Sequence, residues 1–168
     1  MKRFILTVIA LVVGLMIYKD RGVVVIPSEA IRIRIISNSN NISDLKNKYV
    51  IKDKLESYLY SLLKNSKSID EAREIINDNK DNIDKLIKEN SSLTYSFNFG
   101  MNYFPRKTYK GVLYKEGYYE SLEVKLGSGI GDNYWCVLFP PLCMVDENEI
   151  PGDVSYKLYI KKVLKIDN

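Results

Sequence analysis

The chain has 168 residues, with 25 Lys and Arg, 21 Asp and Glu, two cysteines and no histidine. This length matches one domain with enough chain to bury a hydrophobic core. The absence of histidine removes the commonest general base and the usual partner of a catalytic serine or cysteine, and it leaves two cysteines that do not complete an ordinary zinc site.

The first 18 residues have the pattern of an export signal. Lys2 and Arg3 precede an uncharged run of 15 residues from Phe4 to Tyr18, as in the charged and apolar regions of a signal peptide. As a helix this run would span about 22 Å, less than the ~30 Å hydrocarbon core of a bilayer. We therefore predict an exported protein whose residues 1–18 are a cleaved signal peptide or an uncleaved anchor in contact with the membrane.

The next pattern is the alternation of isoleucine and arginine at residues 31–35. A period of two residues predicts a strand with one buried face. The isoleucines form that face, and we expect Arg32 and Arg34 to face solvent, with contact to an anion or a partner as the alternative. The Asn- and Ser-rich residues 37–41 predict a turn.

Three helices are expected between residues 43 and 90. Apolar residues at three- and four-residue spacing predict a long amphipathic helix over 43–64. Ser68 and Glu71 form the pattern of a capping box at the start of a second helix, and a third, short helix follows the "NDNK" break at 77–80. No glycine-rich phosphate loop precedes any of them, so we predict no nucleotide cofactor.

The charge of the chain argues against a nucleic-acid partner. Without residues 1–18 the chain loses two of its 25 basic residues and no acidic one, which leaves 23 against 21 and a net charge of +2. Lysines alternate with acidic residues through the helical segments, which is typical of solvated helix faces and not of a clustered basic stripe.

The second half of the chain predicts strands. "LTYSFNF" at 93–99 alternates apolar and polar residues. Residues 112–114 and 118–126 are expected to form a hairpin around "KEG", with Leu122, Val124 and Leu126 facing inward and Ser121, Glu123 and Lys125 facing outward. "YWCVLF" at 134–139 is apolar on both faces and predicts a central strand, and residues 156–164 predict a terminal helix.

These elements give the expected fold class. We predict an α+β domain over residues 23–168, in which helices pack on one side of a mostly antiparallel sheet, preceded by the hydrophobic N-terminal segment.

No arrangement of residues in the sequence predicts catalysis. Glu120 and Glu123 are three positions apart on an expected strand, so their side chains point to opposite faces and cannot share a substrate. Asp132 lies beside glycine and asparagine and is interpreted as a turn residue. A Ser-Lys pair is formally available, but no motif isolates one. We predict no catalytic residue, no metal site and no cofactor.

The stretch "GSGIGDNYWCVLFPPLC" from Gly127 to Cys143 combines glycines, prolines, the single tryptophan and both cysteines. Gly127, Gly129 and Gly131 are expected to allow a tight approach of the backbone before Trp135, which is interpreted as sheet packing, with partner contact as the alternative. In an exported protein we expect Cys136 and Cys143 to form a disulfide that closes an eight-residue ring, with free buried thiols as the alternative.

Two segments carry a family resemblance. "VVVIPSEAIRIRIISNSN" at 23–40 and "LGSGIGDNYWCVLFPPLC" at 126–143 closely resemble the stage II sporulation protein R family of endospore-forming bacteria. The resemblance implies a protein that the forespore exports into the space between the forespore and mother-cell membranes. It also implies that this protein triggers a membrane-embedded aspartic protease, which processes the precursor of the mother-cell sigma factor. The alternatives are an envelope hydrolase and a structural protein of the spore envelope.

A signalling protein of this kind needs a surface for its partner. The glycine loop and the turn formed by Phe139, Pro140, Pro141 and Leu142 lie at opposite ends of one expected strand, roughly 20 Å apart. We choose the turn as the partner contact, because its side chains are rigid and apolar while backbone geometry explains the glycines. The alternative is that this turn only closes the core.

Overall fold

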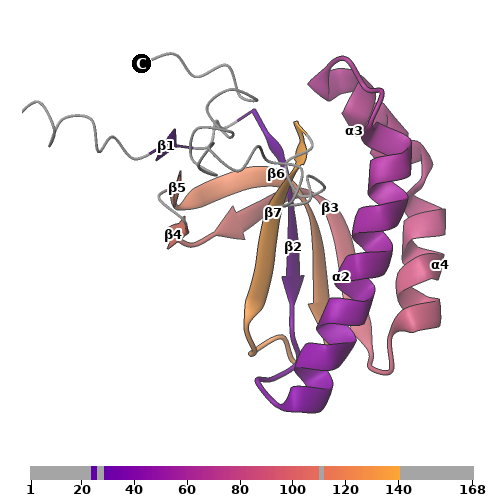
Figure 1. The fold of residues 1–168 in the computed structure, drawn as a ribbon, viewed down its shortest axis with the longest axis vertical. Helices are drawn as coiled ribbons and strands as arrows, with labels where there is room; N and C mark the ends of the chain where they lie inside the picture. Colours follow the sequence, from indigo (N-terminus) through magenta and orange to yellow (C-terminus); the bar gives the residue numbers. More distant parts are fainter. Residues whose placement is uncertain (1–23, 26–28, 110–111, 141–168) are drawn as a thin grey trace, which may run out of the picture.

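A computed structural model describes residues 24–25, 29–109 and 112–140 (Figure 1). The predicted signal segment, the predicted terminal helix and the residues from Pro141 to Cys143 lie outside the described residues. In chain order the elements are β1 (Val24–Val25), β2 (Ile31–Ile36), α2 (Ile42–Leu63), α3 (Ile69–Asp78), α4 (Lys80–Asn90), β3 (Tyr95–Phe104), β4 (Lys107–Tyr109), β5 (Val112–Tyr114), β6 (Gly117–Leu126) and β7 (Asn133–Phe139).

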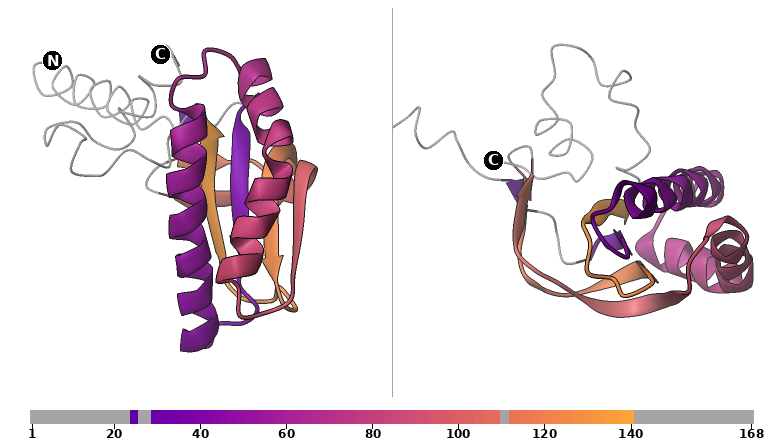
Figure 2. Two further views of the ribbon diagram at one scale, coloured as in Figure 1. Left: turned by 90° about the vertical axis from the view of Figure 1, so that its right-hand side faces the viewer. Right: turned by 90° about the horizontal axis from the view of Figure 1, so that it is seen from below.

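Four of the strands form one sheet in the order β3-β6-β2-β7. β2 runs parallel to β6, and the other two pairs are antiparallel. The three helices lie on one face of this sheet, as both views in Figure 2 show. The predicted α+β class, with helices on one side of a mostly antiparallel sheet, is confirmed, and the three helices have the predicted positions.

The hydrophobic core lies between the helices and the near face of the sheet. α2 presents a buried residue every four positions, at Ile51, Leu55, Leu59 and Leu63, as expected for one stripe of a helix. This stripe packs in one cluster with Ile31, Ile33 and Ile35 of β2 and with Leu122, Val124 and Leu126 of β6. Burial of each such side chain contributes roughly 2 kcal/mol.

The predicted pairing of residues 112–114 with 118–126 is wrong. β5 pairs with β4 and β1 in a small second sheet. β6 instead pairs with β3 over ten residue pairs, from Tyr95 with Leu126 to Phe104 with Gly117. A long ladder with an apolar near face outweighs the local turn, because each further cross-strand pair adds stability.

The predicted central position of "YWCVLF" is also wrong. β7 is an edge strand of the four-stranded sheet and pairs with β2 among the described residues. The two faces of β7 are apolar for different reasons. Cys136 and Leu138 join the core under the helices, whereas Trp135 and Val137 alternate with them and lie on the opposite face of the sheet.

That opposite face is enclosed, so the predicted exposure of Arg32 and Arg34 is wrong. The paired strands β3 and β6 bend, and their ends curl over this face (Figure 2, right). They bring Phe104 and Tyr119 over β2. Arg32 is 1% exposed, and its guanidinium carbon lies 3.4 Å from the centroid of the Tyr119 ring. The arginine is therefore stacked inside a second, aromatic core.

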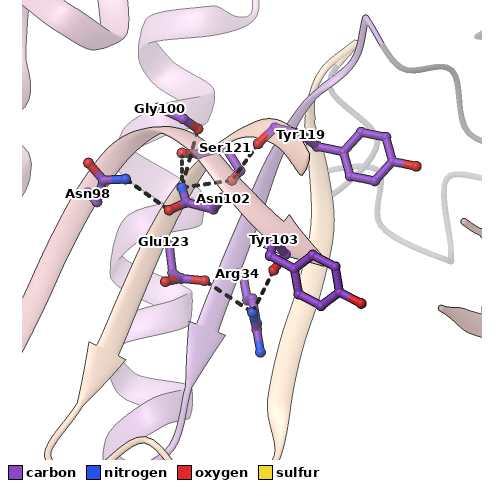
Figure 3. A network of polar contacts seen from close by, with 8 residues as sticks. All are labelled: Arg34, Asn98, Gly100, Asn102, Tyr103, Tyr119, Ser121 and Glu123. Carbon is purple, nitrogen blue, oxygen red and sulfur yellow. Dashed lines mark hydrogen bonds and ion pairs between the residues drawn. The ribbon is translucent and has the colours of Figure 1, made fainter. Parts of the chain in front are cut away.

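Polar contacts line the same enclosed face (Figure 3). Arg34 donates to the backbone oxygen of Tyr103 at 2.9 Å and forms an ion pair with Glu123 at 3.2 Å. Asn102 donates to the backbone oxygen and to the hydroxyl oxygen of Ser121, both at 3.0 Å. Ser121 is fully buried and Glu123 half-buried, so of the three residues predicted to face outward, only Lys125 is exposed.

The contact between Arg32 and Tyr119 can be measured with a double-mutant cycle of Arg32→Met and Tyr119→Leu. We expect a coupling energy of about 2 kcal/mol in urea unfolding, because the guanidinium and the ring are both removed from water. A coupling energy near zero would contradict this account of the enclosed face.

Candidate functional site

The glycine-rich loop at residues 127–132 lies against the turn at residues 37–40. Two backbone hydrogen bonds run from the loop to the turn, from Ile130 N to Asn38 O at 3.2 Å and from Gly131 N to Ser37 O at 2.9 Å. A third runs the other way, from Ser37 N to Asp132 O at 3.3 Å. We call this contact the loop–turn clamp.

Asparagine side chains complete the clamp. The Asn38 side-chain oxygen accepts from the backbone N–H and from the hydroxyl of Ser128, both at 2.9 Å. The Asn40 side-chain oxygen accepts from Asp132 N at 2.7 Å. The amide group of Asn38 donates to Asp44 in the first turn of α2 at 2.8 Å. The clamp thus joins the start of β7 to the start of α2.

The glycines are where the clamp leaves no room for a side chain. Gly127 and Gly129 have φ values of +52° and +62°, in the left-handed region that favours glycine. A Cβ atom on Gly131 would lie 2.4 Å from the backbone oxygen of Ser39. No Cβ atom fits at that distance without movement of the backbone.

Lys48 of α2 is buried beside the clamp. It precedes the apolar stripe of α2 by one helical turn, is 2% exposed, and donates to the backbone oxygen of Asp132 at 3.1 Å. Burial lowers the pKa of its ammonium group; the charge of Asp132 opposes that effect, and the positive charge of Lys107 adds to it.

A cleft of about 500 Å³ opens next to Lys48, between the clamp, α2 and the segment that follows β3. Three cationic residues, one acidic residue and two aromatic rings line it, together with Pro105, Gly131 and Asn133. The charged and aromatic residues are Lys48, Arg106, Lys107, Asp132, Tyr49 and Trp135. The Lys107 ammonium lies 4.9 Å from the Trp135 ring centroid. The cleft is therefore predominantly cationic with aromatic walls, a combination suited to an anionic ligand.

Sequence reasoning placed Trp135 in this region but missed Lys48, Arg106 and Lys107. Lys48 could have been found from the sequence, because it lies three residues before Ile51 and therefore on the same face of α2 as the apolar stripe. Trp135 is half-buried and packs 5.3 Å from Phe104, between ring centroids. It thus belongs both to the aromatic core and to the wall of the cleft.

The predicted partner-contact turn lies at the other end of β7. Phe139 is half-buried and packs against the hydrophobic core, and Pro140 is half-buried. Pro141 and Leu142 lie outside the described residues. Cys136 is buried in β7, and Cys143 also lies outside them, so the disulfide stays a prediction.

The two glutamates of β6 point to opposite faces, as predicted. Glu120 pairs with Arg73 of α3 at 2.6 Å, and Glu123 pairs with Arg34 on the enclosed face. In the described part of the chain, no group of three His, Cys, Asp or Glu side chains is placed to hold a metal ion. Of the helices at residues 42–90, none is long and apolar enough to cross a membrane.

Comparisons with known proteins point to one family. The family model described as stage II sporulation protein R matches residues 27–149. A stage II sporulation protein R of Bacillus subtilis (strain 168) is 39% identical over 128 residues. That alignment covers 73% of this chain and 57% of the relative, so the chain spans less than two thirds of the relative's length. No solved structure matches the chain.

The clamp predicts that Gly131 tolerates a substitution by alanine less well than Gly100 does. Gly131→Ala should lower the free energy of unfolding by about 1–3 kcal/mol, because its Cβ meets the Ser39 backbone. Gly100→Ala is the matched control, since its Cβ would meet only the Asn98 side chain, at 3.7 Å. Urea unfolding measures both, and equal values for the two variants would contradict the clamp.

Lys48 predicts a dependence of stability on pH. Its pKa is below the ordinary value of 10.5 in the folded protein, so as the pH rises the folded protein releases this proton before the unfolded protein does. The unfolded state then binds more protons, and stability increases with pH in that window.

We therefore expect the wild type to gain free energy of unfolding relative to Lys48→Met as the pH rises toward the ordinary lysine pKa of 10.5. Urea unfolding of both proteins across this range measures the effect. If the difference in free energy of unfolding between the two proteins stays constant with pH, the environment of Lys48 does not change its pKa.

Proposed function

The chain belongs to the stage II sporulation protein R family, and from this membership we propose that it acts as an exported signalling protein. The family gives it a role in sporulation. Its proposed action is to trigger a membrane-embedded aspartic protease, which then removes the pro-sequence of the mother-cell sigma factor. The observation that carries this proposal is the family match over residues 27–149, which includes both sides of the loop–turn clamp.

The proposal assigns a binding role and not an enzymatic one. A binding protein benefits from a surface that is fixed before the partner arrives, because less conformational entropy is then lost on association. The clamp supports this role, since it holds the loop at 127–132 and the start of β7 in one arrangement through backbone and asparagine hydrogen bonds.

The proposed place of action is the space between the forespore and mother-cell membranes. Lys2, Arg3 and the uncharged run from Phe4 to Tyr18 support export, and the same run would contact the membrane if it is not cleaved. Export supports the proposed disulfide between Cys136 and Cys143, because disulfides persist outside the reducing cytoplasm.

The turn at residues 139–142 remains the proposed contact with the protease. Phe139 and Pro140 keep part of their surface exposed at the end of β7. Pro140 also limits the backbone freedom of this end, which favours recognition at low entropic cost.

Processing of the sigma-factor precursor in sporulating cells that lack the gene tests this function. We expect the full chain to restore processing and a chain without residues 2–18 to fail, because the protease lies across the membrane from the site of synthesis. Leu142→Glu should abolish processing at normal protein levels, whereas Lys88→Glu on the exposed face of α4 should not.

The outcomes separate the parts of the proposal. Normal processing in the absence of the gene would overturn the signalling role. Normal processing with Leu142→Glu would exclude the turn as the contact, and a Leu142→Glu protein that does not accumulate would assign the turn to the core.

A further inference from the structure

We propose that the cationic cleft beside the loop–turn clamp binds a carboxylate side chain in an acidic segment of a partner protein. The groups that carry this inference are the ammonium of Lys48 in the floor, Arg106 and Lys107 on the rim, and the ring of Trp135 in the wall.

The charge of the cleft favours an anionic ligand. Three cations and one carboxylate line the cleft. Among the described residues, no carboxylate lies within ion-pair distance of Lys48, Arg106 or Lys107. Lys48 uses one donor on the Asp132 backbone oxygen, and an ammonium group has three. Donors are therefore available to a ligand at the most buried cation of the cleft.

Burial of the Lys48 ammonium also favours an anion. Taking a charged group out of water is unfavourable; burial and the charge of Lys107 lower the pKa of Lys48, and the charge of Asp132 offsets only part of this effect. A single anion between Lys48 and Lys107 would offset the desolvation and the repulsion together. We therefore expect an anion that contacts both lysines to bind more tightly than an anion that contacts only one of them.

The size and the apolar part of the cleft indicate the class of anion, because the net positive charge of the lining attracts any anion. A volume of about 500 Å³ exceeds what one small ion fills and lies in the range of ligand sites. The rings of Tyr49 and Trp135 offer apolar contact to the neighbouring side chains of a peptide. A glutamate or aspartate within a peptide fits these features best.

The inference rests on the proposed function only in taking the partner to be the protease. The clamp connects the cleft with the proposed binding role, because it holds the Asp132 backbone oxygen to which Lys48 donates. The cleft and the turn at 139–142 lie at opposite ends of β7, so substitutions in one leave the other intact.

Trp135 is the single tryptophan of the chain, so its fluorescence reports on the cleft directly. The full chain, purified in detergent, is titrated with the peptide acetyl-Glu-Leu-Glu-amide, with its Gln-Leu-Gln counterpart and with inorganic phosphate. We expect saturable binding of the glutamate peptide that weakens with added salt, and at least tenfold weaker binding of the glutamine peptide. Lys107→Gln and Lys48→Met should each weaken binding at least tenfold, whereas Lys88→Gln should not change it.

Equal affinity for the two peptides, or tighter binding of phosphate than of the glutamate peptide, would overturn the inference. If Lys48→Met does not fold, Lys107→Gln and Arg106→Gln decide in its place, because both residues are exposed. The peptide titration tests the cleft alone, whereas the signalling role is tested separately by sigma-factor processing in cells. Weak peptide binding with normal dependence of processing on the gene would remove this inference alone.

Discussion

The turn at residues 37–40 and the loop at residues 127–132 hold one another by backbone hydrogen bonds and by the side chains of Asn38 and Asn40, and the rest of the fold is arranged around this contact. It joins segments about ninety residues apart in the chain. Asn38 also bonds to Asp44 at the start of α2, and the loop leads directly into β7. The two sequence blocks that carry the family resemblance are therefore the two halves of one contact, and each glycine in the second block meets an atom of the first or adopts a left-handed backbone.

A second consequence concerns β2, which lies between two cores. Ile31, Ile33 and Ile35 pack under the helices, and Arg32 is buried on the opposite face beneath Tyr119. The curled ends of β3 and β6 close that face, so both sides of the central strands are fixed by packing. A domain held in this way presents its loops in one conformation, which lowers the entropic cost of binding a partner.

Much of this architecture follows from the sequence, and the exceptions have physical causes. Apolar spacing in the helices and alternation in the strands predict the elements and the α+β class, because periodicity reports which face is buried. Periodicity does not report which strand pairs with which, so it failed for residues 112–114 and for the edge position of β7. It also carries no information on sheet curvature, which is why the burial of Arg32 was missed. The cleft forms from three distant segments, and only Lys48, at a core position of α2, left a signal in the sequence.

We propose that this protein acts by direct contact with the sigma-factor-processing protease. Photo-crosslinking in sporulating cells measures that contact most directly, with p-benzoylphenylalanine placed at Leu142 in the proposed contact turn, at Arg106 on the rim of the cleft and, as a control, at Lys88 on α4. We expect a crosslink to the protease from position 142 and none from position 88, in cells where processing proceeds; a crosslink from position 106 would add the cleft to the contact surface. Processing without a crosslink from either position 142 or position 106, or equal crosslinking from all three positions, would contradict direct contact.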